Sequence, residues 1–199
     1  MEPESRIANV SGAVLLGGAS TRLGQDKARV ELGGVAGATR AARLLDSLFS
    51  EVLLVGGEPP PDAPGARVAD APGPACALRG LVGALEAAGS QRVLVLATDL
   101  PFVSPELLLA LLAWPEAPVV APRTETGVHP LCALYERAAV LRQARDRLAS
   151  GKLELRGLLD AVGAATLDPS VLARVDPDGR ALFNVNTPDD LERARTLLD

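Results

Sequence analysis

Residues 14–27 read VLLGGASTRLGQDK, and this segment indicates both the class of fold and the kind of ligand. An apolar run ends at Gly17-Gly18, and the cations Arg22 and Lys27 follow shortly after it. Apolar residues that stop at glycine are typical of a buried strand that leads into a loop approached closely by another group. Two cations on such a loop favour an anionic ligand.

The glycine spacing fits neither of the two familiar phosphate-binding loops. A dinucleotide fold has G-x-G-x-x-G, whereas the glycines here are Gly17, Gly18 and Gly24. A P-loop has G-x-x-x-x-G-K-[ST], and here the interval is longer and Lys27 does not follow Gly24 directly. Successive backbone N–H groups in such a loop can still form an anion-binding concavity. Arg22 and Lys27 could then neutralise a polyphosphate and the leaving group formed from it; the alternative is a glycine turn with two solvated cations.

The composition indicates a globular protein. The chain has 199 residues, 48% of them hydrophobic, and we expect a single domain over 1–199 because no polar or low-complexity segment divides it. The net charge is −5, and the scattered Lys and Arg residues form no basic stripe of the kind that binds nucleic acid. The N-terminal MEPESR lacks the regions of a signal peptide, and the apolar runs, such as 107–114, are too short to span a bilayer. We therefore expect a cytoplasmic protein that binds neither membrane nor nucleic acid.

The two cysteines predict neither a metal centre nor a disulfide framework. Cys76 and Cys132 fit no paired metal-ligand spacing. We expect both to be partly buried free thiols in a reducing cytosol.

Short apolar runs alternate with amphipathic segments, which predicts strands alternating with helices. The predicted strands are 13–16, 52–55, 67–69, 93–97, 119–121, 131–135, 164–167 and 181–186. The predicted helices are 36–49, 78–88, 105–114, 137–149, 153–161 and 191–198, and the Asp-Pro and Asp-Gly pairs of 168–179 predict turns. This order indicates an α/β fold in three layers, with a mostly parallel sheet covered by helices on both faces.

Glycine or an acid follows three of the predicted strands: Gly17-Gly18, Asp70 and Asp99. Open sheets of this kind bind ligands beyond the carboxyl ends of their strands. A carboxylate at the position of Asp99 is well placed to hold Mg²⁺, which favours oxygen ligands and substrate phosphates. The alternative for Asp99 is a cap for the next helix, although Ser104 already supplies that cap. Asp70 fits a ligand contact and an ordinary loop acid equally well.

Asn184 and Asn186 lie two apart on a predicted strand, so their side chains should face the same way, with Phe183 and Val185 toward the core. These amides could bind ligand or stabilise the following turn. His129, the single histidine, lies beside a proline in a predicted loop. A structural or substrate-loop role is favoured for it over catalysis.

Four segments together resemble the molybdenum cofactor guanylyltransferases. They are LLGGASTRLGQDK (15–27), ATDLPFVSPEL (97–107), VHPLCALY (128–135) and NVNTPDDL (184–191), which occur in the family's order and span nearly the whole chain. The first resembles the signature L-x-G-G-x-S-x-R-M-G-x-D-K. The family belongs to the nucleotidyltransferases with a glycosyltransferase-A-like, Rossmann-type fold, so the resemblance implies that fold here.

The resemblance also implies a reaction, in which a terminal phosphate of molybdopterin attacks the α-phosphorus of GTP and releases pyrophosphate. By this resemblance, Leu15, Leu16 and Gly17 would line the guanosine site, with Gly18 beside the phosphates and Asp70 in contact with the nucleotide. Arg22 and Lys27 would stabilise the triphosphate, and Asp99 would hold Mg²⁺. Asn184 and Asn186 would bind the acceptor. No side-chain nucleophile is needed, because positioning and charge neutralisation supply most of the catalysis in such transfers. The expected partners are GTP and molybdopterin, together with cofactor-delivery proteins or molybdoenzymes, and we expect a monomer.

Three positions depart from the family's pattern. Leu23 replaces a methionine, CALRGL (76–81) stands where G-P-L-x-G-L is common, and VGGEPPP (55–61) lacks an asparagine often found there. The last two departures concern the base-binding side, which keeps open a cytidylyltransferase or a sugar-phosphate nucleotidyltransferase. Gly-Gly instead of Ala-Gly in the first motif favours guanylyl transfer. A nucleotide-binding protein without turnover is a further alternative, against which Arg22, Lys27 and Asp99 argue together.

Overall fold

A seven-stranded sheet forms the centre of the molecule in the computed structural model, which describes residues 6–17 and 27–198. Its strands in chain order are β1 (Ile7–Leu15), β4 (Phe49–Val55), β5 (Ala66–Val68), β6 (Arg92–Ala97), β7 (Val119–Ala121), β10 (Cys132–Glu136) and β11 (Ala165–Thr166). Across the sheet they lie in the order β11-β7-β10-β6-β1-β4-β5. Strand β10 runs antiparallel to its neighbours β6 and β7, whereas the other adjacent pairs are parallel. The prediction of a mostly parallel sheet is confirmed.

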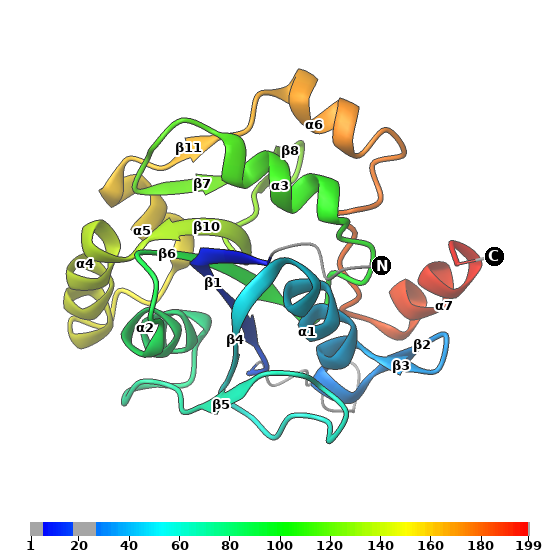
Figure 1. The fold of residues 1–199 in the computed structure, drawn as a ribbon, viewed down its shortest axis with the longest axis horizontal. Coiled ribbons are helices and arrows are strands. Elements are labelled where there is room, and N and C mark those ends of the chain that lie inside the picture. The colour runs from blue at the N-terminus through cyan, green and yellow to red at the C-terminus, as the bar shows by residue number, and fades with distance from the viewer. Residues whose placement is uncertain (1–5, 18–26, 199) are drawn as a thin grey trace.

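Helices cover both faces of this sheet (Figure 1). One face carries α1 (Gly37–Leu48), α3 (Pro105–Ala113) and α6 (Pro169–Val175), and the other carries α2 (Ala77–Ala87), α4 (Arg137–Ala149) and α5 (Leu155–Val162). Successive side chains of a strand point to opposite faces. In β6, Leu94 and Leu96 pack into the core beneath α1 and α3, whereas Val93 and Val95 pack into the core beneath α2 and α4. The predicted three-layer α/β architecture is therefore confirmed.

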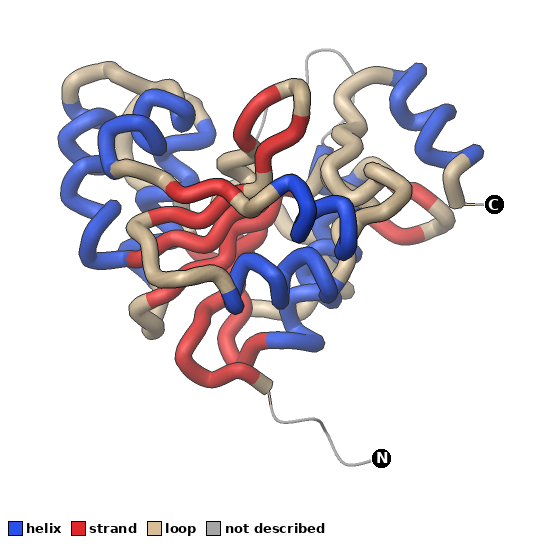
Figure 2. Tube along the Cα trace, turned by 90° about the horizontal axis from the view of Figure 1, so that it is seen from above, coloured by secondary structure: helices blue, strands red, loops and turns tan. Residues whose placement is uncertain are grey.

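Two short hairpins stand outside the main sheet (Figure 2). The elements outside it are the 3-10 helix η1 (Lys27–Arg29), hairpin strands β2 (Glu31–Leu32) and β3 (Val35–Ala36), hairpin strands β8 (Arg123–Thr124) and β9 (Gly127–Val128), and the last helix α7 (Pro188–Thr196). The turn between β2 and β3 is Gly33-Gly34, with φ of +59° and +73°, which glycine adopts without strain. Strands of two residues carry too little alternation to be recognised in a sequence, so neither hairpin is predicted.

The prediction of turns throughout 168–179 is wrong, because α6 occupies Pro169–Val175. Asp168 is the N-cap of this helix, and its carboxylate accepts a hydrogen bond from the Ser170 N–H at 2.8 Å. The proline in the first turn has no N–H, and a helix needs none at that position. The Asp-Pro pair therefore starts a helix here instead of a turn.

The predicted strand 181–186 is also wrong, since these residues form a turn and a loop. Their backbone crosses the carboxyl end of β6, where the Val185 N–H donates to the Asp99 carbonyl at 2.8 Å. Val185 is buried because it packs with β2 and α7. That packing, and not the pleat of a strand, explains why an apolar buried residue, Val185, alternates with the polar half-buried residues Asn184 and Asn186.

The other predicted elements occur within a few residues of their predicted bounds, except that β1 begins at Ile7 instead of residue 13. Helices α3 and α7 begin with side-chain caps, of which the Ser104 cap is the predicted one. Ser104 accepts a hydrogen bond from the Leu107 N–H at 3.3 Å at the start of α3. Thr187 and Asp190 form a capping box at the start of α7.

Both cysteines are free thiols, as predicted. Cys132 is fully buried in β10, and burial raises the pKa of its thiol to about 12. Cys76 is half-buried and precedes α2.

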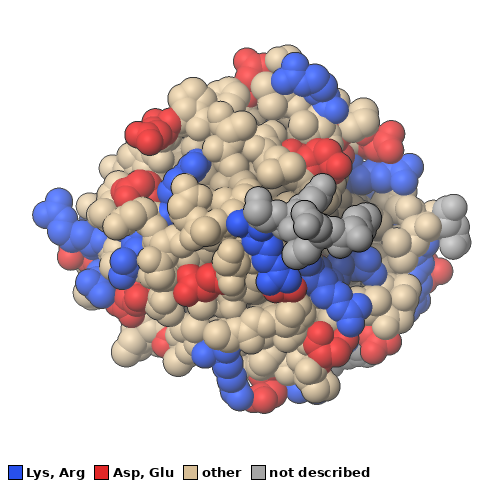
Figure 3. Space-filling model, in the orientation of Figure 1, with Lys and Arg blue, Asp and Glu red and all other residues tan. Residues whose placement is uncertain are grey.

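Positive and negative side chains are interspersed on the face of the molecule shown in Figure 3. Within residues 6–17 and 27–198, no helix combines the length and the apolar composition needed to cross a membrane.

Candidate functional site

A cleft of about 410 Å³ opens at the carboxyl ends of β1 and β6, beside the first turn of α2. The described residues that line it are Leu15, Gly17, Asp70, Ala75, Cys76, Ala77, Arg79, Gly80, Ala97, Thr98, Asp99 and Leu131. Its volume lies within the range of ~300–1,000 Å³ that is typical of small-molecule sites, and its place at the strand ends is the usual one in α/β sheets. The fold thus brings together Leu15, Gly17, Asp70 and Asp99 of the predicted site.

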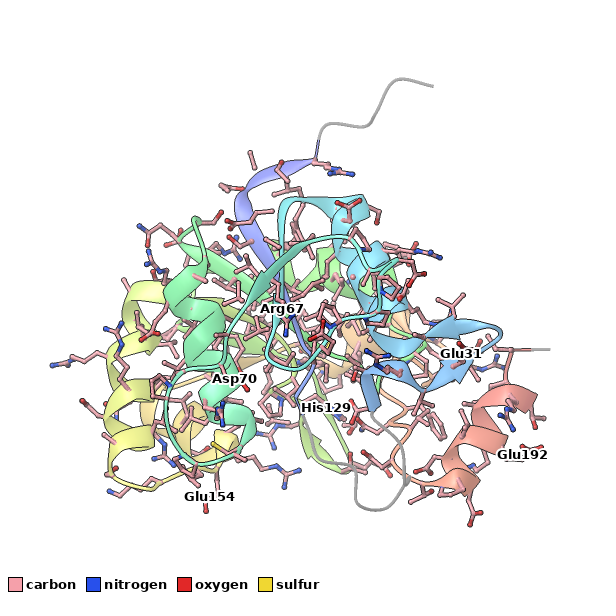
Figure 4. The ribbon with its side chains drawn as sticks, turned by 90° about the horizontal axis from the view of Figure 1, so that it is seen from below. Glu31, Arg67, Asp70, His129, Glu154 and Glu192 are labelled. Carbon is pink, nitrogen blue, oxygen red and sulfur yellow. The ribbon has the colours of Figure 1, made fainter. Side chains whose placement is uncertain are left out.

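Asp70, which lies just beyond β5, packs against Gly56, Gly80 and Gly17, and the first two leave room for its carboxylate. A Cβ atom on Gly56 would lie 2.6 Å from Asp70 Oδ1, and one on Gly80 would lie 3.3 Å from the same oxygen. A Cβ atom on Gly17 would lie 3.8 Å from Oδ2. Figure 4 shows Asp70 beside α2, and its side chain is 20% exposed. The missing side chains of Gly56 and Gly80 therefore leave the space that the carboxylate occupies at the wall of the cleft, whereas the distance from Gly17 is an ordinary contact.

Arg79 contacts this carboxylate from the first turn of α2. Its Nη2 lies 3.3 Å from Asp70 Oδ2, and its Nη1 donates to the Gly73 carbonyl at 3.4 Å, a long hydrogen bond. Its Nε is buried without a partner among the described residues, and its side chain is 30% exposed. Acid and base thus form one partly exposed pair at this end of the cleft.

The start of α2 adds the positive end of a helix to the same wall. Its N-cap, Cys76, makes no side-chain cap hydrogen bond, so N–H groups of the first turn remain for solvent or a ligand. The helix lies close to Ala69 because Gly83 has no side chain: a Cβ atom there would lie 2.7 Å from the Ala69 carbonyl oxygen. Glycine at this position thereby brings Arg79 toward Asp70.

Asp99 lies at the other end of the cleft, directly beyond β6. It also lines a smaller cavity of about 20 Å³ on the opposite side, together with Val30, Leu32, Gly37, Arg40, Thr98, Pro101, Val185 and Leu191. A volume of this size holds about one water-sized group. Asp99 therefore stands between the main cleft and a second cavity bounded by α1, β2 and α7.

The residues around Asp99 fit Mg²⁺ held jointly by the protein and a phosphate ligand. In the part of the chain that the structure describes, no three His, Cys, Asp or Glu side chains gather as a metal site. Mg²⁺ keeps several waters and is usually bound through one or two carboxylates and substrate phosphates, so it needs no such cluster. A single carboxylate that borders a ligand-sized cleft meets this requirement.

Asn184 and Asn186 lie beside Asp99 on the loop before α7. The Asn184 Nδ2 donates to the Leu182 carbonyl at 3.4 Å, and the Asn186 N–H donates to Asp190 Oδ2 at 3.1 Å. The backbone bond from Val185 to Asp99 fixes this loop at the carboxyl end of β6. Both asparagines are half-buried.

Of the remaining predicted site residues, Leu16 and Lys27 belong to the described part of the chain. The Leu16 side chain is 2% exposed and packs into the core beneath α1, so any contact with a ligand would come from its backbone. Lys27 opens η1. Gly18 and Arg22 lie outside the described residues.

His129 makes local contacts at the β8–β9 hairpin. Its Nε2 lies 2.8 Å from Thr124 Oγ1, and its backbone N–H donates to the Pro122 carbonyl at 3.0 Å. Burial, and secondly the nearby Arg156 guanidinium, lower the pKa of the imidazole. These contacts agree with the structural role that the sequence favours.

Arg79 and Thr98 line the cleft but are absent from the predicted site, and Arg40 lines the smaller cavity. Arg79 belongs to CALRGL, the segment that departs from the family pattern. The departure itself lies at Cys76-Ala77, whereas Arg79 occupies the variable position of the pattern, and its contact with Asp70 depends on how α2 packs. Neither Thr98 nor Arg40 carries a sequence signal, because each is placed by the fold alone.

The fold is that of a nucleotidyltransferase. Residues 12–166 match the family model of the MobA-like NTP transferase domain. The chain belongs to this family, and the family and enzyme class predicted from the motifs are confirmed.

Similar proteins agree with this assignment. A protein of Chloroflexus aggregans named probable molybdenum cofactor guanylyltransferase is 36% identical over 198 residues, which cover 95% of each chain. A protein of the same name from Pelotomaculum thermopropionicum is 33% identical, over 97% of this chain and 95% of its own. In fold, the chain is similar to molybdopterin-guanine dinucleotide biosynthesis protein A of Archaeoglobus fulgidus. That comparison has a TM-score of 0.78 at 24% identity and covers 94% of this chain and 98% of the other.

Proposed function

We propose that the protein transfers GMP from GTP to the terminal phosphate of molybdopterin and releases pyrophosphate. The observation that carries this proposal is that Asp99 and Asp70 line the same cleft, and that the Asp70 carboxylate occupies space left by Gly56 and Gly80. The choice of guanine and of molybdopterin is supported by the names of the relatives, which are 33–36% identical over nearly the whole chain.

The strand order supports one direction for the nucleotide. Asp99 follows β6, Gly17 follows β1 and Asp70 lies beyond β5, with β4 between the last two. Neighbouring strands are ~4.8 Å apart. The Asp70 carboxylate reaches back toward the end of β1, where a Cβ atom on Gly17 would lie 3.8 Å from Oδ2. The phosphates would lie at the Asp99 end, near the glycine loop and Lys27. The base would then extend toward Asp70.

The reaction proceeds by displacement at the α-phosphorus. An oxygen of the acceptor's terminal phosphate forms a bond to this phosphorus as the bond to the bridging oxygen of the β-phosphate breaks. Arg22 and Lys27 would neutralise the departing pyrophosphate; a unit-charge pair at ~4 Å is worth ~4 kcal/mol at an effective dielectric of ~20. Asp99 would hold Mg²⁺, which when bound polarises the phosphoryl oxygens. The other residues bind and align the two substrates.

The acceptor would bind on the side of Asn184 and Asn186. Their loop is fixed beside Asp99 by the Val185 N–H, which supports a role for the two amides in holding the acceptor near the reacting phosphate. We also infer that the chain is a single-domain, monomeric and cytoplasmic enzyme whose product passes to cofactor-delivery proteins or molybdoenzymes.

Pyrophosphate release with a panel of nucleoside triphosphates tests this function. The protein is incubated with Mg²⁺, molybdopterin and GTP, CTP, ATP or UTP, and matched reactions omit molybdopterin. We expect release with GTP that depends on molybdopterin. Faster release with CTP would assign a cytidylyltransferase instead. Nucleotide binding without release from any of the four would identify a binding protein without turnover.

A further inference from the structure

The pair formed by Asp70 and Arg79 presents acceptors and donors side by side at the cleft wall. The Asp70 carboxylate is an acceptor with two oxygens, and the Arg79 guanidinium carries five N–H donors in a planar fork. The described residues provide contacts for the two terminal nitrogens of Arg79, through Asp70 and the Gly73 carbonyl, and none for Nε. Each terminal nitrogen carries two hydrogens, so donor capacity remains on the partly exposed side of the fork.

The position of the pair fits the base end of a nucleotide that binds in the proposed direction. If the phosphates lie near Asp99, the nucleoside extends along the strand ends toward Asp70, as argued for the proposed function. Among the described residues that line the cleft, Arg79 carries the positive charge, and it lies at this end. Apart from Asp70 and the Gly73 carbonyl, which it already contacts, the Arg79 guanidinium can then meet the base of a nucleotide held in this way.

The edge of guanine complements this pair. Guanine offers the N1–H and the 2-amino group as adjacent donors, with O6 as an acceptor beside them. A carboxylate can accept from the two donors while a neighbouring guanidinium donates to O6. Cytosine offers one amino donor and two acceptors. In the orientation of guanine it would turn its acceptors toward the carboxylate, and in the reversed orientation it would give the carboxylate one donor instead of two. Buried polar groups left without partners are the strongest means of rejecting a wrong ligand.

We propose that Arg79 determines the preference for guanine, by donating a hydrogen bond to O6 while it holds the Asp70 carboxylate toward the N1–H and 2-amino groups. This inference rests on the proposed function, because it takes GTP as the bound nucleotide. It adds a residue outside the predicted site, in the segment CALRGL that departs from the family pattern.

The test compares Arg79→Met with Arg67→Met. Arg67 is a matched control, because it forms an ion pair with Glu58 at the same edge of the sheet, at 2.6 Å, and its side chain is 59% exposed (Figure 4). The readout is the affinity for GTP, CTP and 6-thio-GTP, measured by displacement of a fluorescent GTP analogue. In 6-thio-GTP, sulfur replaces O6, which leaves a weak acceptor and keeps both donors.

We expect Arg79→Met to weaken GTP binding about 10- to 100-fold, the loss typical of a good polar pair to a base, and to change CTP binding by less than about threefold. The wild-type preference for GTP over 6-thio-GTP should disappear in Arg79→Met and persist in Arg67→Met. If Arg79→Met fails to fold, Arg79→Lys keeps the charge without the planar fork and should lose the GTP preference by about tenfold. Unchanged ratios of GTP to CTP and of GTP to 6-thio-GTP in the folded variant would overturn the proposal.

Binding and turnover separate this inference from the proposed function. If the wild-type protein binds GTP selectively but transfers nothing to molybdopterin, the proposed function fails, and the ratios still test Arg79. If transfer from GTP occurs and the folded Arg79 variant keeps the wild-type ratios, the function stands and the role of Arg79 fails.

Discussion

Replacing Gly56 by alanine tests whether glycines fix the Asp70 carboxylate in the position that a nucleotide requires. Gly56 has φ of +72°, and an added Cβ atom would lie 2.6 Å from Asp70 Oδ1 and 2.9 Å from its Cγ. The substitution therefore has two effects. It places alanine in the left-handed region of the backbone, and it drives the carboxylate away until the contact reaches an ordinary 3.4 Å or more.

Gly151 separates these effects, because it has the same φ of +72° and an added Cβ atom meets nothing within 4 Å. A left-handed alanine costs about 1–2 kcal/mol. In a protein of this size each kcal/mol lowers Tm by about 2–4 °C. We expect Gly151→Ala to show this loss alone. Gly56→Ala should show at least the same loss and should also weaken GTP binding by about tenfold or more, since Asp70 is displaced.

Thermal unfolding measures the stability of both variants, and displacement of a fluorescent GTP analogue measures their affinity. Both are compared with the wild-type protein below the lower Tm. Gly56→Ala that binds GTP within about twofold of Gly151→Ala would refute the reasoning, because the displaced carboxylate would then contribute almost nothing to binding.

Other residues give further predictions. Asp99→Ala and Lys27→Ala should each lose most of the pyrophosphate-release activity and remain folded by circular dichroism; activity within about twofold of wild type would contradict the role of that residue. Removal of divalent metal with EDTA should stop release and added Mg²⁺ should restore it, whereas full activity in EDTA would exclude the assigned role of Asp99. The pKa of His129 is lowered in the folded protein, so protonation below its ordinary value of 6.5 favours the unfolded chain and stability falls as pH falls. His129→Gln should therefore lose less Tm between about pH 7 and pH 5 than the wild-type protein, and an unchanged slope would show that His129 does not contribute. Thr187→Ala breaks the capping box of α7 and should cost about 0.5–2 kcal/mol in chemical unfolding; no change in midpoint would contradict its role as a cap.

The layers of the fold were predictable because burial on both faces leaves a strong pattern in the sequence. VLVLA (93–97) is apolar at each position, because the side chains on each face of this strand enter a hydrophobic core. Other patterns are ambiguous by nature. Asp-Pro at residue 168 fits a turn and a helix start equally well, and only the packing of α6 on α3 decides between them. The alternation around Val185 has the period of a strand, but a loop packed on a small cluster produces it too.

The cleft residues that directly follow strands were predictable from the sequence. The cleft residues brought together by the packing of a helix against a loop were not. Gly17, Asp70 and Asp99 each follow a strand, so a parallel sheet gathers them at one edge. The contact of Arg79 with Asp70 needs α2 to lie against residues 69–71, and that approach depends on the missing side chain of Gly83. No spacing rule along the chain contains this information. The place of Arg40 in the lining of the smaller cavity likewise depends on how α1 is positioned beside Asp99.

The identity of the dinucleotide product tests the central claim most directly. The protein is given molybdopterin, Mg²⁺ and equal concentrations of GTP and CTP, and the products are separated and identified by mass spectrometry. The account predicts molybdopterin joined to GMP, with pyrophosphate formed in equal amount. A product joined to CMP, or no dinucleotide while GTP is bound, would contradict it.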